Sequence, residues 1–440
     1  MTRARIDGLT FLLLGAAVFI LFGITIASDS PVKMVDFRSV YYSARCLIQH
    51  HDPYQESEVL RVAQAEGGNL PWDNARHVMQ YIYMPTIFSF TAPFGLLPWG
   101  AAHILWMTLT IVGLIFASLL LWNLGVCYSP VVSGVLIGFL LANSELLVVT
   151  GNAAGLAIVL CIVAVWCFLR ERFAFAGILC LAISLAIKPQ DSGLVWLYFL
   201  LAGRAYRKRA LQSLFAMAVL SLPAVLWVWR VAPNWIDELH SSILALSAHG
   251  SLSDPSPASA GAHGLGMMVN LQTVFSTFWD EPRFYNPASY LVIAPLLLLW
   301  AFVTLRSRPT AQKTWLALAA IAPITLLPVY HRQVDAKLLL LAVPACAMLW
   351  AEGGRIGRIA LAVTSAAIVL NGDLSWAILL ALIPHLPLPP TELTRQFLIA
   401  IQVFPVPLTL LATGIFYLWI YVKRCSAEAP LPAAEVSFPQ

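Results

Sequence analysis

Long apolar runs without charge constrain this chain more than any other feature. The first covers residues 8–27, and comparable runs recur almost to the C-terminus. The runs are continuous rather than alternating, which predicts helices and not strands. Only 11% of the 440 residues are charged, whereas soluble domains carry roughly 25%. Because lipid satisfies no backbone amide or carbonyl, the sequence predicts an all-α, polytopic transmembrane protein, with 1–440 as a single integral membrane domain.

Thirteen apolar segments are candidates for membrane helices, since a spanning helix needs about 20 residues. They are 8–28, 83–97, 101–122, 129–149, 153–169, 173–187, 190–202, 210–229, 289–305, 315–329, 337–351, 359–383 and 398–422. The first run exceeds the roughly 7–15 apolar residues of a cleaved signal, so we expect an uncleaved helix. The seven cysteines show no paired spacing and predict neither a disulfide framework nor a metal knuckle.

Basic residues in short loops set the expected orientation, because such loops face the cytoplasm. The clusters are Arg3/Arg5, Arg170/Arg172, Arg204/Arg207/Lys208/Arg209, Arg306/Arg308/Lys313, Arg355/Arg358 and Lys423/Arg424. With both termini inside, the number of spans must be even, so one early segment does not cross. The candidates are 83–97, which is short and carries prolines, and 129–149, interrupted by Asn143, Ser144 and Glu145. We expect about twelve spans and a re-entrant or broken early segment lining a cavity.

Two long loops then lie outside, at 29–82 and 230–288. The first contains Phe37, Val40, Tyr41, Ala44 and Leu47 at helical spacing, which predicts a helix along the membrane interface. Most histidines and acidic residues fall on this outer face. Groups able to move protons are therefore expected opposite the basic loops.

Asp36 lies a few residues beyond the first helix, at the level of the lipid headgroups. A carboxylate there could take a proton from an attacking hydroxyl. Asp is also a favoured N-cap, so Asp36 could instead cap the following helix. The two roles are compatible, because a cap leaves one carboxylate oxygen free.

Four further polar positions occur at the mouths of apolar segments. Tyr83 could belong to an interfacial aromatic belt. Gly151-Asn152 opens a helix, whose N-terminus attracts anions, or is an ordinary loop. Lys188 lies outside against the positive-inside trend, so it pairs with Asp191, binds a phosphate or snorkels to the interface. His331 and Arg332 occupy a short loop where they could hold a phosphate, although loops are usually polar for solubility.

Together these pieces resemble glycosyltransferase family 87 of the GT-C superfamily, the bacterial α-1,2-mannosyltransferase-like proteins. The resemblance rests on Asp36-Phe-Arg-Ser-Val-Tyr-Tyr-Ser-Ala-Arg45 with Asp52-Pro-Tyr54, then Tyr83-Met-Pro85, Gly151-Asn152, Lys188-Pro-Gln190 and Tyr330-His331. Two departures are Met84, where the family has a proline, and Asn152, where it has a glutamine.

The resemblance implies a GT-C-like fold in a bacterial plasma membrane and a polyprenyl-phosphate-sugar donor, with mannose as the family's sugar. Asp36 is then the base, and Lys188, His331 and Arg332 bind phosphate. Asn152, Tyr41, Tyr83 and Gln190 are expected to bind substrate. The acceptor is expected to be a glycolipid or glycan, with transfer on the extracytoplasmic face and inversion. No cofactor, metal or nucleic-acid partner is expected.

Three other classes remain open. A transporter or flippase places charged residues at mid-membrane in broken helices. An O-antigen-ligase or polymerase-type enzyme uses a large late outer loop, and the 230–288 loop keeps this option open. A structural protein without catalysis would show no transfer.

Overall fold

The computed structural model describes residues 2–29, 34–66, 81–251, 253–258, 268–382, 385 and 391–426. In this part of the chain all regular structure is helical, apart from one antiparallel bridge between Met268 and Arg332. The predicted all-α class is confirmed. The predicted outer loops 29–82 and 230–288 include residues 30–33, 67–80, 252 and 259–267, which lie outside the described ranges.

The N-terminal half contains α1 (Arg3–Asp29), α2 (Val35–Ile48), α3 (Glu56–Ala65), η1 (Pro85–Ile87), α5 (Phe88–Gly95), α6 (Trp99–Gly125), α7 (Pro130–Leu141), α8 (Glu145–Thr150), α9 (Ala154–Leu169), α10 (Ala174–Ile187), α11 (Pro189–Leu201) and α12 (Arg204–Val231). The C-terminal half contains α13 (Trp235–Ser247), α14 (Gln272–Ser276), α15 (Pro282–Arg306), α16 (Ala311–Thr325), η3 (Asp335–Ala342), α17 (Val343–Glu352), α18 (Gly354–Leu370), α19 (Asp373–Leu382), α20 (Glu392–Val403) and α21 (Pro405–Ser426).

Six helical stretches of the described chain are long and apolar enough to cross a membrane. They are Arg3–Ser28, Trp99–Gly125, Pro130–Thr150, Arg204–Val231, Pro282–Arg306 and Glu392–Ser426. The expected count of about twelve is not confirmed. Two further apolar helices, Ala154–Leu169 and Ala174–Ile187, are shorter.

Both early segments that the charge pattern singled out are irregular. The segment at 83–97 forms the short η1 turn and the eight-residue α5. The segment at 129–149 is interrupted between Leu141 and Glu145, so that α7 and α8 are separate helices. The predicted break at Asn143 and Ser144 is therefore present in the structure.

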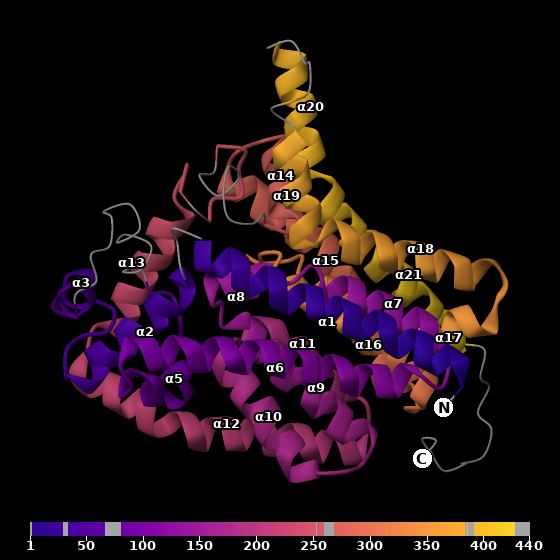
Figure 1. Cartoon of the computed structure of the whole chain (residues 1–440), viewed down its shortest axis with the longest axis horizontal. Coiled ribbons are helices and arrows are strands. Elements are labelled where there is room, and N and C mark those ends of the chain that lie inside the picture. Colours follow the sequence, from indigo (N-terminus) through magenta and orange to yellow (C-terminus); the bar gives the residue numbers. More distant parts are fainter. Residues whose placement is uncertain are drawn as a thin grey trace.

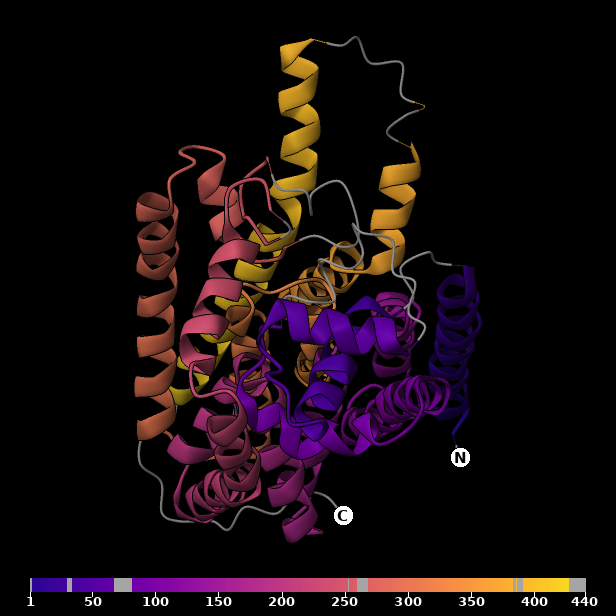
Figure 2. The ribbon, with the colours of Figure 1, turned by 90° about the vertical axis from the view of Figure 1, so that its left-hand side faces the viewer.

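Helices distant in sequence pack side by side around the apolar core. α1 lies along α7, α6 along α9, and α16 along α21 (Figure 1). The α1–α7 contact is close because Gly15 faces Gly138, and a Cβ atom on Gly15 would lie 2.1 Å from the Gly138 carbonyl oxygen. Small residues permit such approach between membrane helices. In the perpendicular view, α20 extends away from the other helices (Figure 2).

The predicted amphipathic helix of the first outer loop is α2. Phe37, Val40, Tyr41, Ala44 and Leu47 are all buried, which confirms the helical spacing. Their face packs on α5 and on aromatic side chains of α6, with the ring centroids of Phe37 and Trp106 4.4 Å apart. The apolar side of α2 is therefore covered by protein.

Candidate functional site

Asp36 lies in the first turn of α2, where the helix dipole favours a negative charge. Met34, not Asp36, occupies the N-cap position, so the capping role considered for Asp36 is wrong. The Asp36 side chain is half-buried, and its Oδ2 atom accepts a hydrogen bond of 2.8 Å from the Asn152 Nδ2 atom. Two residues 116 positions apart in sequence thus meet at the start of α2.

The turn between α8 and α9 orients Asn152. Gly151 adopts φ +66°, and a Cβ atom there would lie 2.7 Å from the Cβ atom of Phe37, so a glycine is required. The Asn152 Oδ1 atom accepts from the backbone N–H of Ala154 at 2.9 Å. This bond assigns Oδ1 to the start of α9 and directs the Nδ2 donor towards Asp36. Asn152 therefore links the start of α9 with the start of α2.

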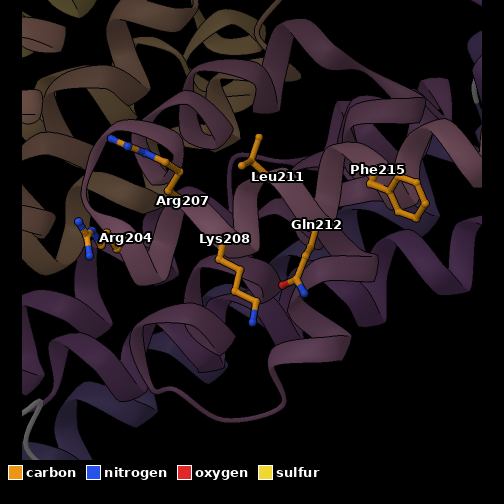
Figure 3. A pocket seen from close by; sticks show the side chains of 6 residues that line it. All are labelled: Arg204, Arg207, Lys208, Leu211, Gln212 and Phe215. Carbon is orange, nitrogen blue, oxygen red and sulfur yellow. The ribbon is translucent and has the colours of Figure 1, made fainter.

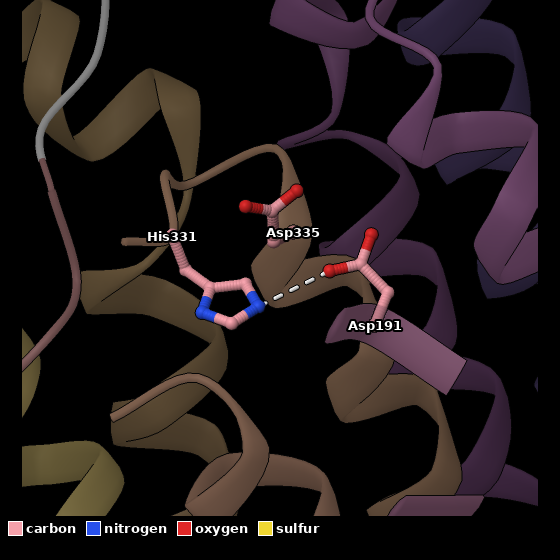
Figure 4. Close-up of side chains that lie close together, drawn as sticks. All are labelled: Asp191, His331 and Asp335. Atoms are coloured by element: carbon pink, nitrogen blue, oxygen red, sulfur yellow. Dashed lines mark ion pairs between the residues drawn. The ribbon is translucent and has the colours of Figure 1, made fainter. Parts of the chain in front are cut away.

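A second cluster forms at the break between α10 and α11. Lys188 contacts Asp335 through its Nζ atom and lies 3.5 Å from the Asp191 Oδ2 atom. The His331 Nε2 atom lies 3.3 Å from Asp191 Oδ1. Figure 4 marks this pair with a dashed line. All four side chains are buried. Burial alone would lower the pKa of Lys188, but the two carboxylates outweigh it and raise that pKa, which keeps the ammonium charged.

Arg332 connects this cluster with Asp36. Its backbone N–H donates to Asp335 Oδ2 at 2.9 Å, and its Nε atom donates to the Tyr330 hydroxyl. Burial opposes its charge, but Tyr330, Asp36 and Asp335 together raise the pKa of Arg332. The guanidinium therefore lies within electrostatic reach of both carboxylates.

Tyr83 lies near both Asp36 and Lys188. Burial and the nearby Asp36 carboxylate raise the pKa of its hydroxyl, and Lys188 acts in the opposite direction. Its backbone carbonyl accepts from the Tyr54 hydroxyl at 2.9 Å, which anchors the segment in the first outer loop. Tyr83 thus interacts with both the Asp36 region and the Lys188 cluster.

Six of the eight residues predicted from sequence come together in this site. They are Asp36, Tyr83, Asn152, Lys188, His331 and Arg332. Tyr41 and Gln190 do not join them. Tyr41 is fully buried and donates to the Leu97 carbonyl at 2.8 Å, and Gln190 is exposed at the start of α11.

Asp335 is a residue of the site to which the sequence assigned no role, and Tyr330 was noted only in the Tyr330-His331 resemblance. Asp335 begins η3 just after the loop that carries His331, but nothing in its spacing indicates that it meets Lys188, 147 residues earlier. The pairing of Lys188 with Asp191 was one of the alternatives, and the structure supports it. Asp36, Asp191 and Asp335 contribute three carboxyl groups to the site, and Lys188 and Arg332 contribute two basic groups.

Among the described residues, two groups of side chains have the composition of a divalent-metal site. The donor atoms of Asp191, His331 and Asp335 lie within 4.8 Å of one another, and so do those of His249, Asp254 and Asp280. Carboxylate and imidazole are ordinary ligands for such ions. In the first group Lys188 already contacts both carboxylates, so an ammonium supplies the positive charge there.

Cavities of the described chain also occur along α12, away from this cluster. One of about 460 Å³ is lined by Arg204, Arg207, Lys208, Leu211, Gln212 and Phe215 (Figure 3). Another of about 800 Å³ is lined by His50, Leu226, Trp227, Arg230 and Val231. Neither cavity is lined by a residue of the site that contains Asp36 and Lys188.

Comparison with known proteins gives one match. Residues 81–279 fit the family model of glycosyltransferase family 87. This range contains Tyr83, Asn152 and Lys188, whereas Asp36 and His331 lie outside it. No curated protein and no solved structure gives a significant match. The resemblance inferred from the sequence is confirmed, and the family indicates a glycosyltransferase.

Proposed function

Because residues 81–279 match glycosyltransferase family 87, we propose that this membrane protein transfers a sugar from a polyprenyl-phosphate donor to an acceptor hydroxyl. The proposed sugar is mannose, the acceptor is a glycolipid or glycan, and transfer takes place on the extracytoplasmic face of a bacterial plasma membrane. The observation that carries this proposal is that Asp36 lies within electrostatic reach of Arg332, whose backbone N–H donates to Asp335 of the Lys188 cluster. A base and positive charge are what this reaction needs.

Asp36 is the proposed general base. The acceptor oxygen attacks the anomeric carbon and forms the new glycosidic bond, while its proton passes to the Asp36 carboxylate. Asn152 holds one carboxylate oxygen at 2.8 Å, so the other is positioned for the incoming hydroxyl. A single displacement at the anomeric carbon inverts its configuration, which differs from the covalent intermediate of retaining enzymes.

The leaving group is proposed to be stabilised by Lys188, Arg332 and His331. The bond between the anomeric carbon and the phosphate oxygen breaks, and the electron pair remains on the phosphate. The phosphate gains one negative charge, so it needs positive charge rather than a protonating acid. Asp191 and Asp335 hold Lys188 charged in a buried place before the donor arrives.

The setting suits a lipid-linked donor. The isoprenoid tail remains in the bilayer, and the phosphosugar must meet the base and the cations at one depth. Asp36 follows α1 directly, and α1 is one of the six helices with the length and apolarity of a span. The family match favours transfer over the transporter and ligase alternatives.

A deletion strain tests the proposal. Mass spectrometry of its envelope glycolipids and glycans should show one missing sugar, which names sugar and acceptor together. The wild-type protein should restore that sugar. The Asp36→Asn variant should not, because a general base contributes roughly 10²–10⁴-fold to the rate. Asp7→Asn, an exposed carboxylate at the other end of α1, is the matched control and should restore it.

Full restoration by Asp36→Asn would contradict the proposed base. An unchanged envelope in the deletion strain, examined with each class of glycan, would contradict the transferase function itself.

A further inference from the structure

The interruption between α7 and α8 leaves backbone groups without partners inside a helix. Two charged side chains act as hydrogen-bond partners for these groups. The Asn143 carbonyl accepts from the Nζ atom of Lys337. The Leu146 N–H, in the first turn of α8, donates to the Asp373 Oδ2 atom at 2.8 Å. A broken helix within a membrane protein persists only where such partners are present.

Lys337 and Asp373 also pair with each other, with 3.3 Å between Lys337 Nζ and Asp373 Oδ1. Both side chains are nearly buried, at 3% and 11% exposure. Buried charges are stable only when paired and hydrogen-bonded, so the arrangement of this pair is fixed. Lys337 belongs to η3, two residues after Asp335 of the Lys188 cluster, and Asp373 begins α19.

The other end of α8 is attached to the start of α2. The Val149 carbonyl accepts from the Met34 N–H at 2.8 Å, and the following turn places Asn152 against Asp36. α8 has only six residues, so a displacement at its first turn reaches its last. Helix α8 therefore contacts Lys337 and Asp373 near its first residue, and Asn152, just after its last residue, contacts Asp36.

We infer that Lys337 and Asp373 are positioning residues, which set the place of Asp36 relative to the Lys188–His331 cluster through α8. η3 carries both Asp335 and Lys337, so one rigid element links the two halves of the site. The expected loss of transfer activity rests on the proposed function, whereas the expected increase in hydrogen exchange does not.

The double variant Lys337→Met/Asp373→Asn isolates this role. Methionine fills the volume of the lysine stem, and asparagine still accepts from the Leu146 N–H. The substitutions remove both charges of the pair together, and the neighbouring Glu145 carboxyl stays buried as in the wild type, so the variant should fold. The break nevertheless loses the Lys337 donor on Asn143 and the ion pair. A matched control is Tyr417→Phe, which removes a buried hydrogen bond of 2.6 Å to Thr364, between α21 and α18.

Hydrogen exchange of the full-length protein in nanodiscs gives the first readout. In the double variant, amides at Met34 and at 146–154 should exchange at least 10-fold faster than in the wild type, and those of α21 should not. Unchanged exchange at Met34 and at 146–154, or a uniform increase over all helices, would overturn the inference.

Transfer kinetics give the second readout, with radiolabelled polyprenyl-phosphate mannose as donor and a lipid extract of the deletion strain as acceptor. A misplacement of about 1 Å can reduce a rate by roughly 100-fold. We expect kcat of the double variant to fall by about 10- to 100-fold with donor KM within about 2-fold. Lys337→Arg should retain more activity than Lys337→Met.

Asn152→Ala should then reduce kcat much less in the double-variant background than in the wild type, because both changes act through Asp36. Fully additive effects, or a kcat equal to that of Tyr417→Phe, would overturn the positioning role. If the wild type itself transfers no label, the proposed function fails, and the exchange result still decides the inference.

Discussion

Lys188 is the residue whose surroundings most change how the site is understood. From sequence, its place at an outer rim predicted pairing with Asp191, a phosphate ligand or a snorkelling side chain. In the structure it is buried and contacts two carboxylates. Its charge is therefore held in place by protein groups, and a donor phosphate would add to an existing network.

Removal of the Lys188 charge should destabilise the protein, because Asp191 and Asp335 would remain buried without their cation. For Lys188→Met we expect a loss of about 3–5 kcal/mol in the free energy of unfolding, the usual effect of breaking a buried pair. Thermal unfolding in nanodiscs, followed as Tm, measures it.

The double variant Lys188→Met/Asp335→Asn should recover much of the lost Tm, since one carboxylate leaves with the lysine. Its transfer activity should stay low, because the phosphate-binding charge is still absent. If Lys188→Met has the same Tm as the wild type, the charge of Lys188 does not stabilise the buried Asp191 and Asp335 carboxyl groups, and the prediction is wrong.

The residue types of the site were largely predictable, and their partners were not. Asp36, Tyr83, Asn152, Lys188, His331 and Arg332 are polar groups at the mouths of apolar segments, and polarity in such places is visible in a sequence. The contact between Lys188 and Asp335 depends on how α11 and η3 pack. A local pattern carries no information on that packing.

Among the elements, α13 contains a carboxylate that responds to pH. Burial and the neighbouring Asp52 carboxylate raise the pKa of Glu238 to about 7. In the unfolded chain this group has its ordinary pKa near 4.5, so the folded protein binds the extra proton between these values. Stability therefore falls as pH rises from about 4.5 to about 7.

We expect Tm of the wild type to fall more between pH 5 and pH 8 than Tm of Glu238→Gln, whose amide does not ionise. Glu56→Gln, which changes an exposed carboxylate of α3, is the control and should follow the wild type. The same pH dependence in Glu238→Gln and wild type would show that Glu238 ionises normally.

The helices of the first outer loop and the break near Asn143 were predictable, because spacing and interrupting polar residues mark them. The number of spans was not. α9, for example, is apolar on all sides and buried inside the protein, and it has only 16 residues. Hydropathy does not separate a helix buried in protein from one that faces lipid, so the number of spans stays a prediction.

At the scale of the whole molecule, several basic clusters meet one another. Arg209 lies 3.9 Å from Glu171, beside Arg172, and Arg424 contacts Glu352 and Gln312. Such grouping agrees with the expectation that these loops share one face. Which face lies in the cytoplasm stays a prediction, and with it the side of the membrane on which transfer takes place.

The proposed reaction takes its sugar from a lipid-linked donor and uses the Asp36 carboxylate as the general base. The most direct measurement is transfer by purified protein in proteoliposomes, with a lipid extract of the deletion strain as acceptor. Labelled polyprenyl-phosphate mannose and labelled GDP-mannose are supplied in parallel. We expect label to move only from the lipid-linked donor, and Asp36→Asn to reduce the rate by roughly 100-fold or more. Transfer from the nucleotide sugar, or undiminished transfer by Asp36→Asn, would contradict the proposed reaction.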